Sequence, residues 1–540
     1  MRRRAYSPPR ACGRTLVFAV GSSVLAITLV ACAVGPNYTR EAAPVPTHYK
    51  ELKGWKLANP SDGVARGDWW KVYRDRGLDA LLPQVEISNQ TVAASAAAYE
   101  EARAIIREAQ SALFPVATAA YGVTRTRTGA RAGTTGGSLV GTGLTTRYTT
   151  QYSAPISGSW DIDVWGRLRR QVESDTAAAQ ASAADLDNAK LSAQAALATA
   201  YFNLRASDAL IDLLQRTIAE DTKTYEIVNN QFKAGFSVTA GDVASADANI
   251  RTAQAQLAVA REQRAQFEHA IALLIGRPPA ELTIAPRQLS GGIPRTPAMV
   301  PSALLERRPD IAASERTMQE ENALIGVAEA AYFPDISLSS MLQYIGPIPL
   351  PFEAARSIGQ IGANGTQTLF NGGLTSAQVD AARAVYWESV ANYRQTVLTA
   401  FQQVEDELAA IHYLSQQLAA ERRAVADERQ AVDVFLNQFR AGTVAFTTVT
   451  VAELLLLSDQ EAELSARQNL FLASVSLIEA LGGGWDTTLL PDQFQLQKDF
   501  SFVPKLDSPT PLAVELTPKV PTPSNPPSAP QPLPSAQPPQ

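Results

Sequence analysis

The sequence predicts a mainly α-helical protein with a membrane β-barrel portion, built from two tandem structural repeats. Three observations support this fold class. Short landmarks recur in the same order in both halves of the chain, proline-free helical stretches are too long for a globule, and each half carries strands with the alternation of membrane barrels. One fold made of two halves is therefore expected, rather than the several unrelated domains that length alone suggests.

The duplication is visible in four short motifs. Each recurs roughly 200 residues later with the order kept, which indicates a duplicated unit. The pairs are ALFP at 112–115 and AYFP at 331–334, VWGRL at 164–168 and FNGGL at 370–374, QFKAG at 231–235 and QFRAG at 438–442, and LIG at 274–276 and ALG at 480–482.

Composition excludes several classes of protein. The chain has 47 Lys and Arg against 53 Asp and Glu, so its charge gives no reason to expect nucleic-acid binding. Its three histidines and two cysteines are far apart and have no zinc-type spacing. No nucleophile–base pair appears, and Gly482, Gly483 and Gly484 lack the Lys-Ser/Thr of a phosphate loop, which makes them a helix end. We expect neither an enzyme nor a cofactor.

The N-terminus is typical of an exported lipoprotein. A basic start precedes an apolar stretch, 18–29, that is too short to span a bilayer. It ends in LVAC at 29–32, which resembles the bacterial lipobox, whose cysteine receives a diacylglycerol and an N-acyl chain. Cys32 is therefore the predicted lipidation site. Ala33, in place of the Asp that retains lipoproteins at the inner membrane, indicates the outer membrane. The alternative is an ordinary secretory signal with an incidental cysteine.

The helices are expected to be unusually long. Residues 156–277 and 352–490 contain no proline, are rich in good helix formers, and repeat apolar residues at three- and four-residue spacing. The longest helices, at 167–234 and 373–441, would each reach about 100 Å, so they must pack side by side. Shorter helices, stacked end to end in pairs beside the long ones, are expected at 78–113, 240–275, 308–332 and 447–481. Periodicity alone leaves a soluble antiparallel coiled coil as an alternative.

Strands lie between the first short helix and the long helix of each half. In residues 148–164, mostly apolar side chains alternate with mostly polar ones. This alternation is longer than that of a typical strand in a soluble β-sandwich. Such alternation is typical of a membrane barrel. The four expected strands cannot close around water, and an open edge in lipid leaves unpaired backbone groups, so several chains must share one barrel. The strands are expected at 116–128, 148–164, 335–345 and 359–370.

Four further stretches identify a family. They are DWW at 68–70, LLERRPDI at 304–311, IGVAEAAYFP at 325–334 and IEALGGGW at 478–485. With the order of elements, they make the chain resemble the TolC-type outer membrane factors, most closely their NodT-like lipoprotein branch. The resemblance implies a homotrimer whose twelve-stranded outer-membrane β-barrel continues into a long periplasmic α-helical barrel. The resemblance covers nearly the whole chain from Cys32 to about residue 492.

The resemblance also implies function and partners. Such a protein is the exit duct of a tripartite pump, with a periplasmic membrane-fusion adaptor and an inner-membrane RND transporter, and it passes drugs or other toxic small molecules outward. Two alternatives remain open: a duct for secreted polypeptides or polymers, and a structural envelope lipoprotein that does not conduct.

The expected division of the chain follows this architecture. It comprises a signal peptide at 1–31, a lipidated N-terminal segment and equatorial belt at 32–77, repeat 1 at 78–276, an equatorial connector at 277–303, repeat 2 at 304–482, an equatorial C-terminal segment at 483–503, and a disordered Pro-rich tail at 504–540.

Functional residues are expected at the free ends of the long helices. Gly235 and Gly442 mark the turns where the adaptor should dock. Family members often narrow the entrance with an Asp ring after the second turn. Here Val451 stands where that Asp is common, and Thr447 where a bulky aliphatic residue is common, so the candidate gate is neutral or apolar. Asp242 is a gate candidate or a helix cap after Thr239, and packing between helices is the alternative for Thr447 and Val451.

Overall fold

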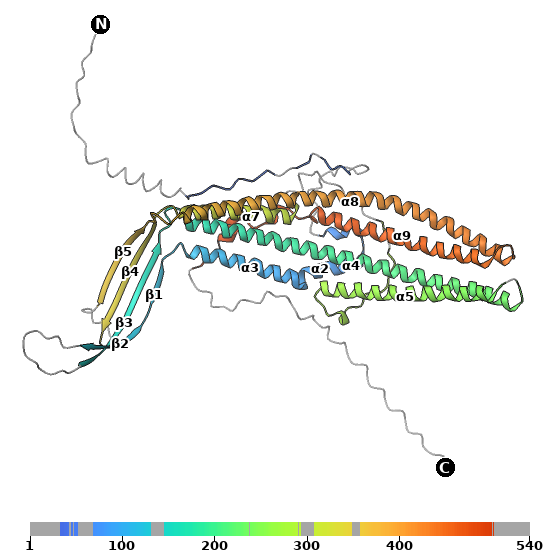
Figure 1. Ribbon diagram of the computed structural model, residues 1–540, viewed down its shortest axis with the longest axis horizontal. Coiled ribbons are helices and arrows are strands. Elements are labelled where there is room, and N and C mark those ends of the chain that lie inside the picture. The colour runs from blue at the N-terminus through green and yellow to red at the C-terminus, as the bar shows by residue number, and fades with distance from the viewer. Residues whose placement is uncertain are drawn as a thin grey trace, which may run out of the picture.

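The computed structural model is an elongated molecule with strands at one end and helical turns at the other (Figure 1). The predicted signal peptide, the predicted lipidation site Cys32 and the predicted tail at 504–540 lie outside the described residues. The structure describes residues 33–42, 45–46, 48–51, 68–130, 145–236, 238–289, 291–292, 307–347, 357–498 and 500–501.

The elements repeat as predicted. The first half comprises η1 (Trp69–Tyr73), α2 (Arg76–Ser88), α3 (Gln90–Ser111), β1 (Val116–Ala119), β2 (Gly122–Ala130), β3 (Thr145–Asp161), α4 (Arg167–Lys233), α5 (Ala240–Leu274) and η2 (Pro279–Glu281). The second comprises α7 (Pro309–Ala330), β4 (Asp335–Gly346), β5 (Ser357–Thr366), α8 (Leu374–Arg440), α9 (Phe446–Ala480), η4 (Thr487–Leu489) and α10 (Gln493–Gln497).

The long helices confirm the duplication. Both α4 and α8 have 67 residues, and α5 and α9 have 35 each. Each long helix follows a glycine in the left-handed conformation, Gly166 before α4 and Gly373 before α8. At 1.5 Å per residue, each long helix extends about 100 Å. No helix within the described residues is both long and apolar enough to cross a bilayer.

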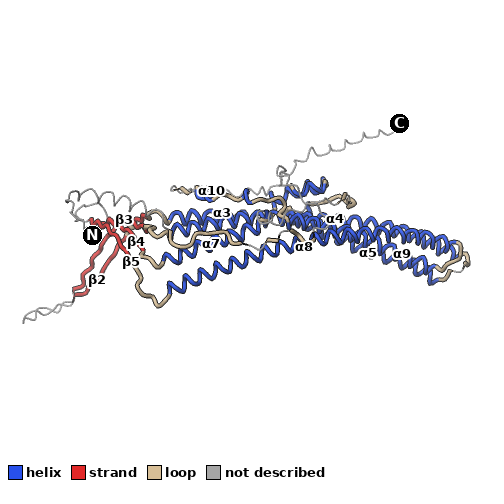
Figure 2. The backbone as a smooth tube through the Cα atoms, turned by 90° about the horizontal axis from the view of Figure 1, so that it is seen from above, coloured by secondary structure: helices blue, strands red, loops and turns tan. Residues whose placement is uncertain are grey.

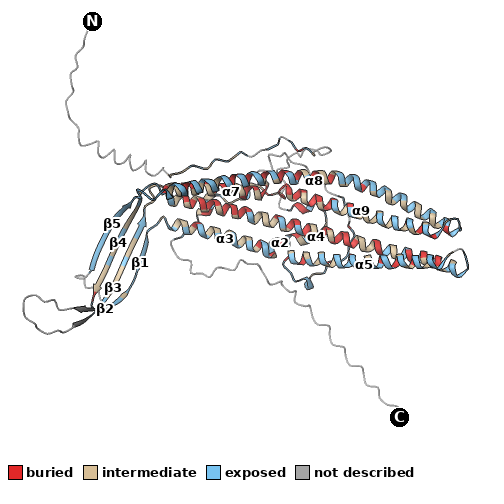
Figure 3. Cartoon of the chain, in the orientation of Figure 1, coloured by how far each residue is buried: buried red, intermediate tan, exposed pale blue. Residues whose placement is uncertain are grey.

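The short helices flank the long ones in stacked pairs. In Figure 1, α3 and α5 run alongside α4 on one side, and α7 and α9 lie between α4 and α8. Figure 2 shows the same helices from above. The four helical layers form a single wall, and buried residues lie between neighbouring helices (Figure 3). η1 and α2 also pack against this wall, where Trp70 and Leu78 belong to the same buried cluster as Tyr201.

Two predicted elements were wrong in detail. The expected helix 78–113 is two helices, because Asn89 adopts an extended conformation and its side chain accepts hydrogen bonds from the backbone N–H groups of Thr91 and Val92. Such an N-cap ends one helix and begins the next. The expected strand 116–128 is likewise divided into β1 and β2, which both pair with β3.

The strands form one antiparallel sheet in the order β1–β3–β4–β5, with β2 continuing the edge next to β3. Ser159 pairs with Val116 on one side and with Ser339 on the other, so β3 is central. Strand β5 is exposed along its whole length, and Ile361 has 93% of its surface accessible. The sheet therefore has two free edges within the described chain, which excludes the plain coiled coil.

Candidate functional site

The two helical turns at the free end have the same backbone design. Gly235 and Gly442 have φ angles of 76° and 74°. The backbone N–H of the residue after each glycine donates a hydrogen bond to the carbonyl five residues earlier. Phe236 donates to Gln231 at 3.1 Å, and Thr443 donates to Gln438 at 2.9 Å. This closure is a helix C-cap that requires the left-handed conformation, which explains the repeated QFKAG and QFRAG motifs. We call these two turns the tip.

Asp242 caps α5. Its Oδ2 accepts hydrogen bonds from the backbone N–H of Thr239 at 2.8 Å and from the hydroxyl of Thr239, while its own N–H donates to Thr239 Oγ1 at 3.2 Å. This reciprocal capping box is the second of the two roles expected for Asp242. A carboxylate held in this way stabilises the N-terminus of α5.

Thr447 and Val451 lie on the exposed face of α9, one helical turn apart. Val451 has 56% of its surface accessible, and Leu454 and Leu455 continue the exposed face. The opposite face of α9 buries Phe446, Val449 and Ala452, which pack within the chain. Within one protomer, Thr447 and Val451 therefore do not pack between helices.

Carboxyl groups near the tip lie on another face, which sequence reasoning missed. We call the stretch where α4 residues 214–228 run beside α9 residues 446–457 the α4–α9 seam. Asp221 is buried in it, and Thr224 donates a hydrogen bond of 3.0 Å to Glu453. In the sequence, Asp221 and Glu453 each lie among apolar residues at heptad-like spacing, which indicates a buried helix face. The sequence does not indicate that the two helices contact each other at these positions.

A second candidate region lies where the short helices meet end to end, which we call the joints. At the first joint, Ser88 Oγ and Asn89 Nδ2 donate to the carbonyls of Ile275 and Leu274 at 2.6 and 2.7 Å. These bonds satisfy the carbonyl groups left open at the end of α5. The predicted end-to-end stacking is thereby confirmed.

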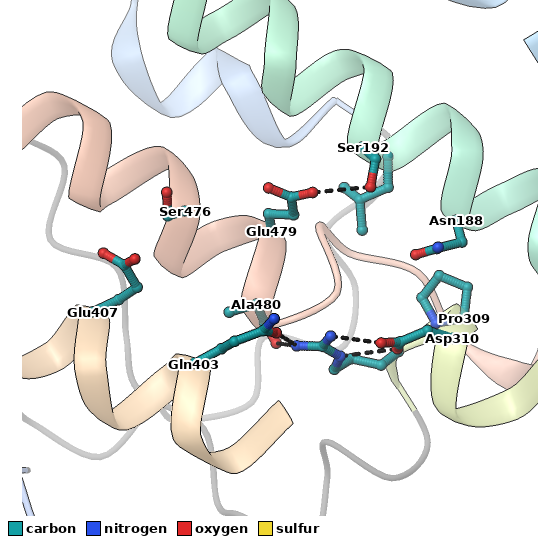
Figure 4. Close-up of a pocket in the computed structure, with 11 residues that line it drawn as sticks. Asn188, Ser192, Pro309, Asp310, Gln403, Glu407, Ser476, Glu479 and Ala480 are labelled. Carbon is teal, nitrogen blue, oxygen red and sulfur yellow. Dashed lines mark hydrogen bonds and ion pairs between the residues drawn. The ribbon is translucent and has the colours of Figure 1, made fainter. Parts of the chain in front are cut away.

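At the second joint, Arg308 joins the start of α7 to the end of α9 through hydrogen bonds to Asp310 and Ala480, which Figure 4 labels. Its guanidinium donates to both oxygens of Asp310 at 2.9 and 2.6 Å, to the side chain of Gln403 at 2.8 Å, and to the carbonyl of Ala480 at 3.0 Å. A planar, five-donor group suits this simultaneous recognition. Arg308 thus connects α7, α8 and α9.

A cavity of about 400 Å³ opens beside Arg308. Burial raises the pKa of Glu479, although Ser192 donates a hydrogen bond of 3.0 Å to it. Burial also raises the pKa of Glu407, with Asp406 adding to the effect. Figure 4 shows Glu479 and Glu407 on separate helices around this space. Among the described residues, no cluster of His, Cys, Asp and Glu has the make-up of a metal site.

The N-terminal segment begins where strands and helices meet. The N–H of Val34 donates to the carbonyl of Trp165 at 2.9 Å, and Arg170 donates to the carbonyls of Val34 and Gly35, both at 3.1 Å. Gly35 also lies so close to Gly326 that no side chain fits between them. The segment is therefore fixed to the boundary that follows β3.

Aromatic side chains surround the same boundary. Trp165 stacks on Phe333 with ring centroids 4.8 Å apart and donates from its indole N–H to the carbonyl of Pro334 at 2.8 Å. Tyr332, which precedes Phe333, and Phe370, which lies between β5 and α8, are both exposed. Amphipathic rings of this kind are enriched at membrane–water interfaces, which puts the membrane on the strand side of the boundary.

An open sheet with an aromatic boundary, joined to a wall of 100 Å helices, defines a membrane channel protein extended by a helical tunnel. The sequence profile of the family described as outer membrane efflux protein matches residues 81–277 and 300–483. The chain belongs to this family. It is the outer-membrane channel of an efflux pump, with a periplasmic helical part, and not an enzyme.

Individual relatives agree. The toluene efflux pump outer membrane protein TtgC of Pseudomonas putida is 28% identical over 476 residues, covering 86% of this chain and 95% of the relative. The pyoverdine export outer membrane protein OpmQ of Pseudomonas aeruginosa is 28% identical over 462 residues, covering 85% and 96%. The solved structure of the outer-membrane channel OprN superposes with a TM-score of 0.75 at 27% identity, covering 84% of this chain and all of OprN.

Proposed function

We propose that three copies of this chain form one closed channel. The observation that carries this proposal is the sheet, whose β1–β2 edge and β5 edge lack partner strands among the described residues. Lipid does not tolerate unpaired edges, and three sheets, each four strands wide, make a twelve-stranded barrel with an aqueous lumen. Apolar side chains exposed on the outermost helices support the same assembly: Ile105, Val259 and Leu273 on α3 and α5, and Trp387, Leu398 and Tyr413 on α8.

The proposed partners are a periplasmic adaptor and an inner-membrane RND transporter. The tip offers the adaptor two turns of equal geometry, and nothing lies within 4 Å of a side-chain position at Gly235 or Gly442. Two relatives carry the names of toluene and pyoverdine export. We therefore assign small toxic or amphiphilic molecules as the substrate class, driven outward by the transporter's energy.

A lipid anchor on Cys32 fits the position of the N-terminal segment. Ala33, the next residue, lies against Gly166 at the start of α4, beside the aromatic boundary. Acyl chains attached one residue earlier would reach the inner leaflet of the outer membrane directly. Acylation by more than one chain gives stable anchoring.

Cys32→Ala is expected to abolish incorporation of radiolabelled palmitate into the protein, because no other thiol stands in a lipobox. Cys12→Ala is the matched control and should keep full labelling, since residue 12 belongs to the predicted signal peptide. Labelling that persists in Cys32→Ala contradicts the proposed anchor.

The gate proposal concerns Thr447 and Val451. Three copies of their exposed α9 face around a threefold axis would form a neutral, weakly wetted constriction, and the following Leu454 and Leu455 would extend it. Constrictions of this kind close by dewetting. The capping role of Asp242 supports a gate without an acidic ring at this level.

Purified protein in planar bilayers tests both channel and gate. We expect a trimer with small ion conductance and a several-fold larger conductance in Val451→Asn, because an amide side chain hydrates the constriction. Val72→Asn is the control, since Val72 is similarly exposed, on η1, which belongs to neither turn. A trimer that conducts in no variant contradicts the channel, and an equal gain in Val72→Asn contradicts the gate.

A further inference from the structure

Near the tip, the α4–α5 and α8–α9 hairpins are held together mainly by the α4–α9 seam. Above and below its centre the seam is apolar: Val228 and Val449 belong to one buried cluster, and Leu214 and Leu457 to another. Between them lie the carboxyl groups of Asp221 and Glu453. Any movement that separates the two hairpins must open this seam.

The two carboxyl groups lack a compensating cation. Thr224 donates to Glu453 at 3.0 Å, but no described lysine or arginine forms an ion pair with Asp221 or Glu453. The nearby charge that affects both groups is Glu220 on α4, which is also negative. Asp221 is buried and Glu453 is half-buried. A carboxylate removed from water without a cation is costly, and two of them repel each other.

We propose that the α4–α9 seam is a pH-sensitive latch of the channel, closed when Asp221 and Glu453 are protonated and loosened when both are ionised. This inference rests on the proposed channel function. The hydroxyl of Thr450, one turn before Glu453, is buried without a hydrogen-bond partner among the described residues, so the closed seam is not fully satisfied even in its neutral form.

The direction of the pH effect follows from the two carboxyl groups. Burial raises the pKa of Asp221 from 3.8 to about 6, with Glu220 adding to it. Burial raises the pKa of Glu453 from 4.5 to about 7, with Asp221 and Glu220 adding and the Thr224 hydrogen bond opposing. The two carboxyl groups therefore bind protons more tightly in the closed seam than in an open, hydrated one. The stabilisation that their protonation gives to the closed seam is fully present below about pH 4 and is lost as the pH rises to about 7.

Bilayer recordings of the full-length trimer at pH 5 and pH 8 test the latch. We expect the open fraction of the wild-type protein to be roughly tenfold or more higher at pH 8, since one unit of pKa corresponds to tenfold in the equilibrium. The double variant Asp221→Asn with Glu453→Gln should stay at the pH 5 level at both values. Both substitutions preserve side-chain shape, so folding is retained.

Asp427→Asn is the matched control. Asp427 is exposed on α8, at a distance from the end of its helix similar to that of Asp221 from the end of α4. This variant should keep the wild-type pH response. A pH response that survives in the double variant, or its absence in a wild-type protein that conducts, overturns the latch.

Hydrogen exchange separates this inference from the channel proposal. Amide exchange in residues 446–457, corrected for intrinsic rates, should be faster at pH 8 than at pH 5 in the wild type and equal in the double variant. This readout needs no conductance. Absence of ion conductance in the bilayer contradicts only the channel proposal, whereas an amide exchange rate that is equal at pH 5 and pH 8 in the wild type contradicts the latch.

Discussion

Gly482→Ala is expected to prevent the protein from assembling stably in the outer membrane, whereas Gly442→Ala is expected to be tolerated. Both glycines have left-handed φ angles, 88° and 74°. An alanine in that conformation costs about 1–2 kcal/mol at either position. At Gly442 nothing lies within 4 Å of the added Cβ, so this strain is the whole cost.

Gly482 and Gly442 differ in the space available for an added Cβ atom. A Cβ at Gly482 would overlap the carbonyl oxygen of Arg307, which is backbone at the start of α7 and cannot rotate away. The second joint must then separate, and we expect a loss of more than about 4 kcal/mol. Gly276→Ala, whose Cβ would overlap the carbonyl of Ser88 at the first joint, should behave like Gly482→Ala.

Outer-membrane abundance and thermal unfolding followed by far-ultraviolet circular dichroism measure the difference. Gly235→Ala and Gly442→Ala form the matched pair at the tip, with the same substitution and the same backbone conformation. Equal losses at the joints and at the tip would show that conformation, and not contact between stacked helices, makes the joint glycines necessary.

Arg308→Ala is expected to destabilise the protein by about 3 kcal/mol. Removing the guanidinium leaves the Asp310 carboxylate and the Ala480 carbonyl without their partner beside the cavity, and loss of one member of a buried charged pair costs about 3–5 kcal/mol. Arg308→Lys should recover part of the loss. An ammonium group retains the charge but cannot reach Asp310, Gln403 and Ala480 together.

Thermal midpoints of the purified proteins check this order: the wild type should have the highest midpoint, Arg308→Lys an intermediate one and Arg308→Ala the lowest. Arg423→Ala provides the reference, because Arg423 is exposed on α8, where removal of an arginine should change stability by no more than about 0.5 kcal/mol. A midpoint for Arg308→Ala equal to that of Arg423→Ala would contradict the role of Arg308 in joining the helices.

Much of the fold was accessible from local patterns. Apolar periodicity located α4 and α8 to within a residue or two, and the alternation at 148–164 located most of β3. The errors are instructive. Asn89 lies inside a continuous helical pattern, yet its side chain caps α3 and also donates to the carbonyl of Leu274 at the end of α5. The cap is local, but the contact with α5 joins distant segments, and no local pattern contains it.

The candidate sites divide in the same way. Gly235 and Gly442 were recognisable because a helix end imposes its own conformation on a few neighbouring residues. The sequence did not pair Asp221 with Glu453, although Glu453 lies two residues after the candidate gate residue Val451. Their proximity depends on the relative register of α4 and α9, which is set by packing along the whole seam.

By itself the sequence determined the duplication, the lengths of the long helices, the presence of strands in both halves, and the family, because each depends on residues close together or on repeated motifs. Only the tertiary structure decided how the ends of the short helices meet at Arg308 and Asn89, which face of α9 is exposed, and which carboxyl groups are buried together. These features arise from contacts between distant segments, and their energies depend on burial and geometry that exist only once the helices have packed.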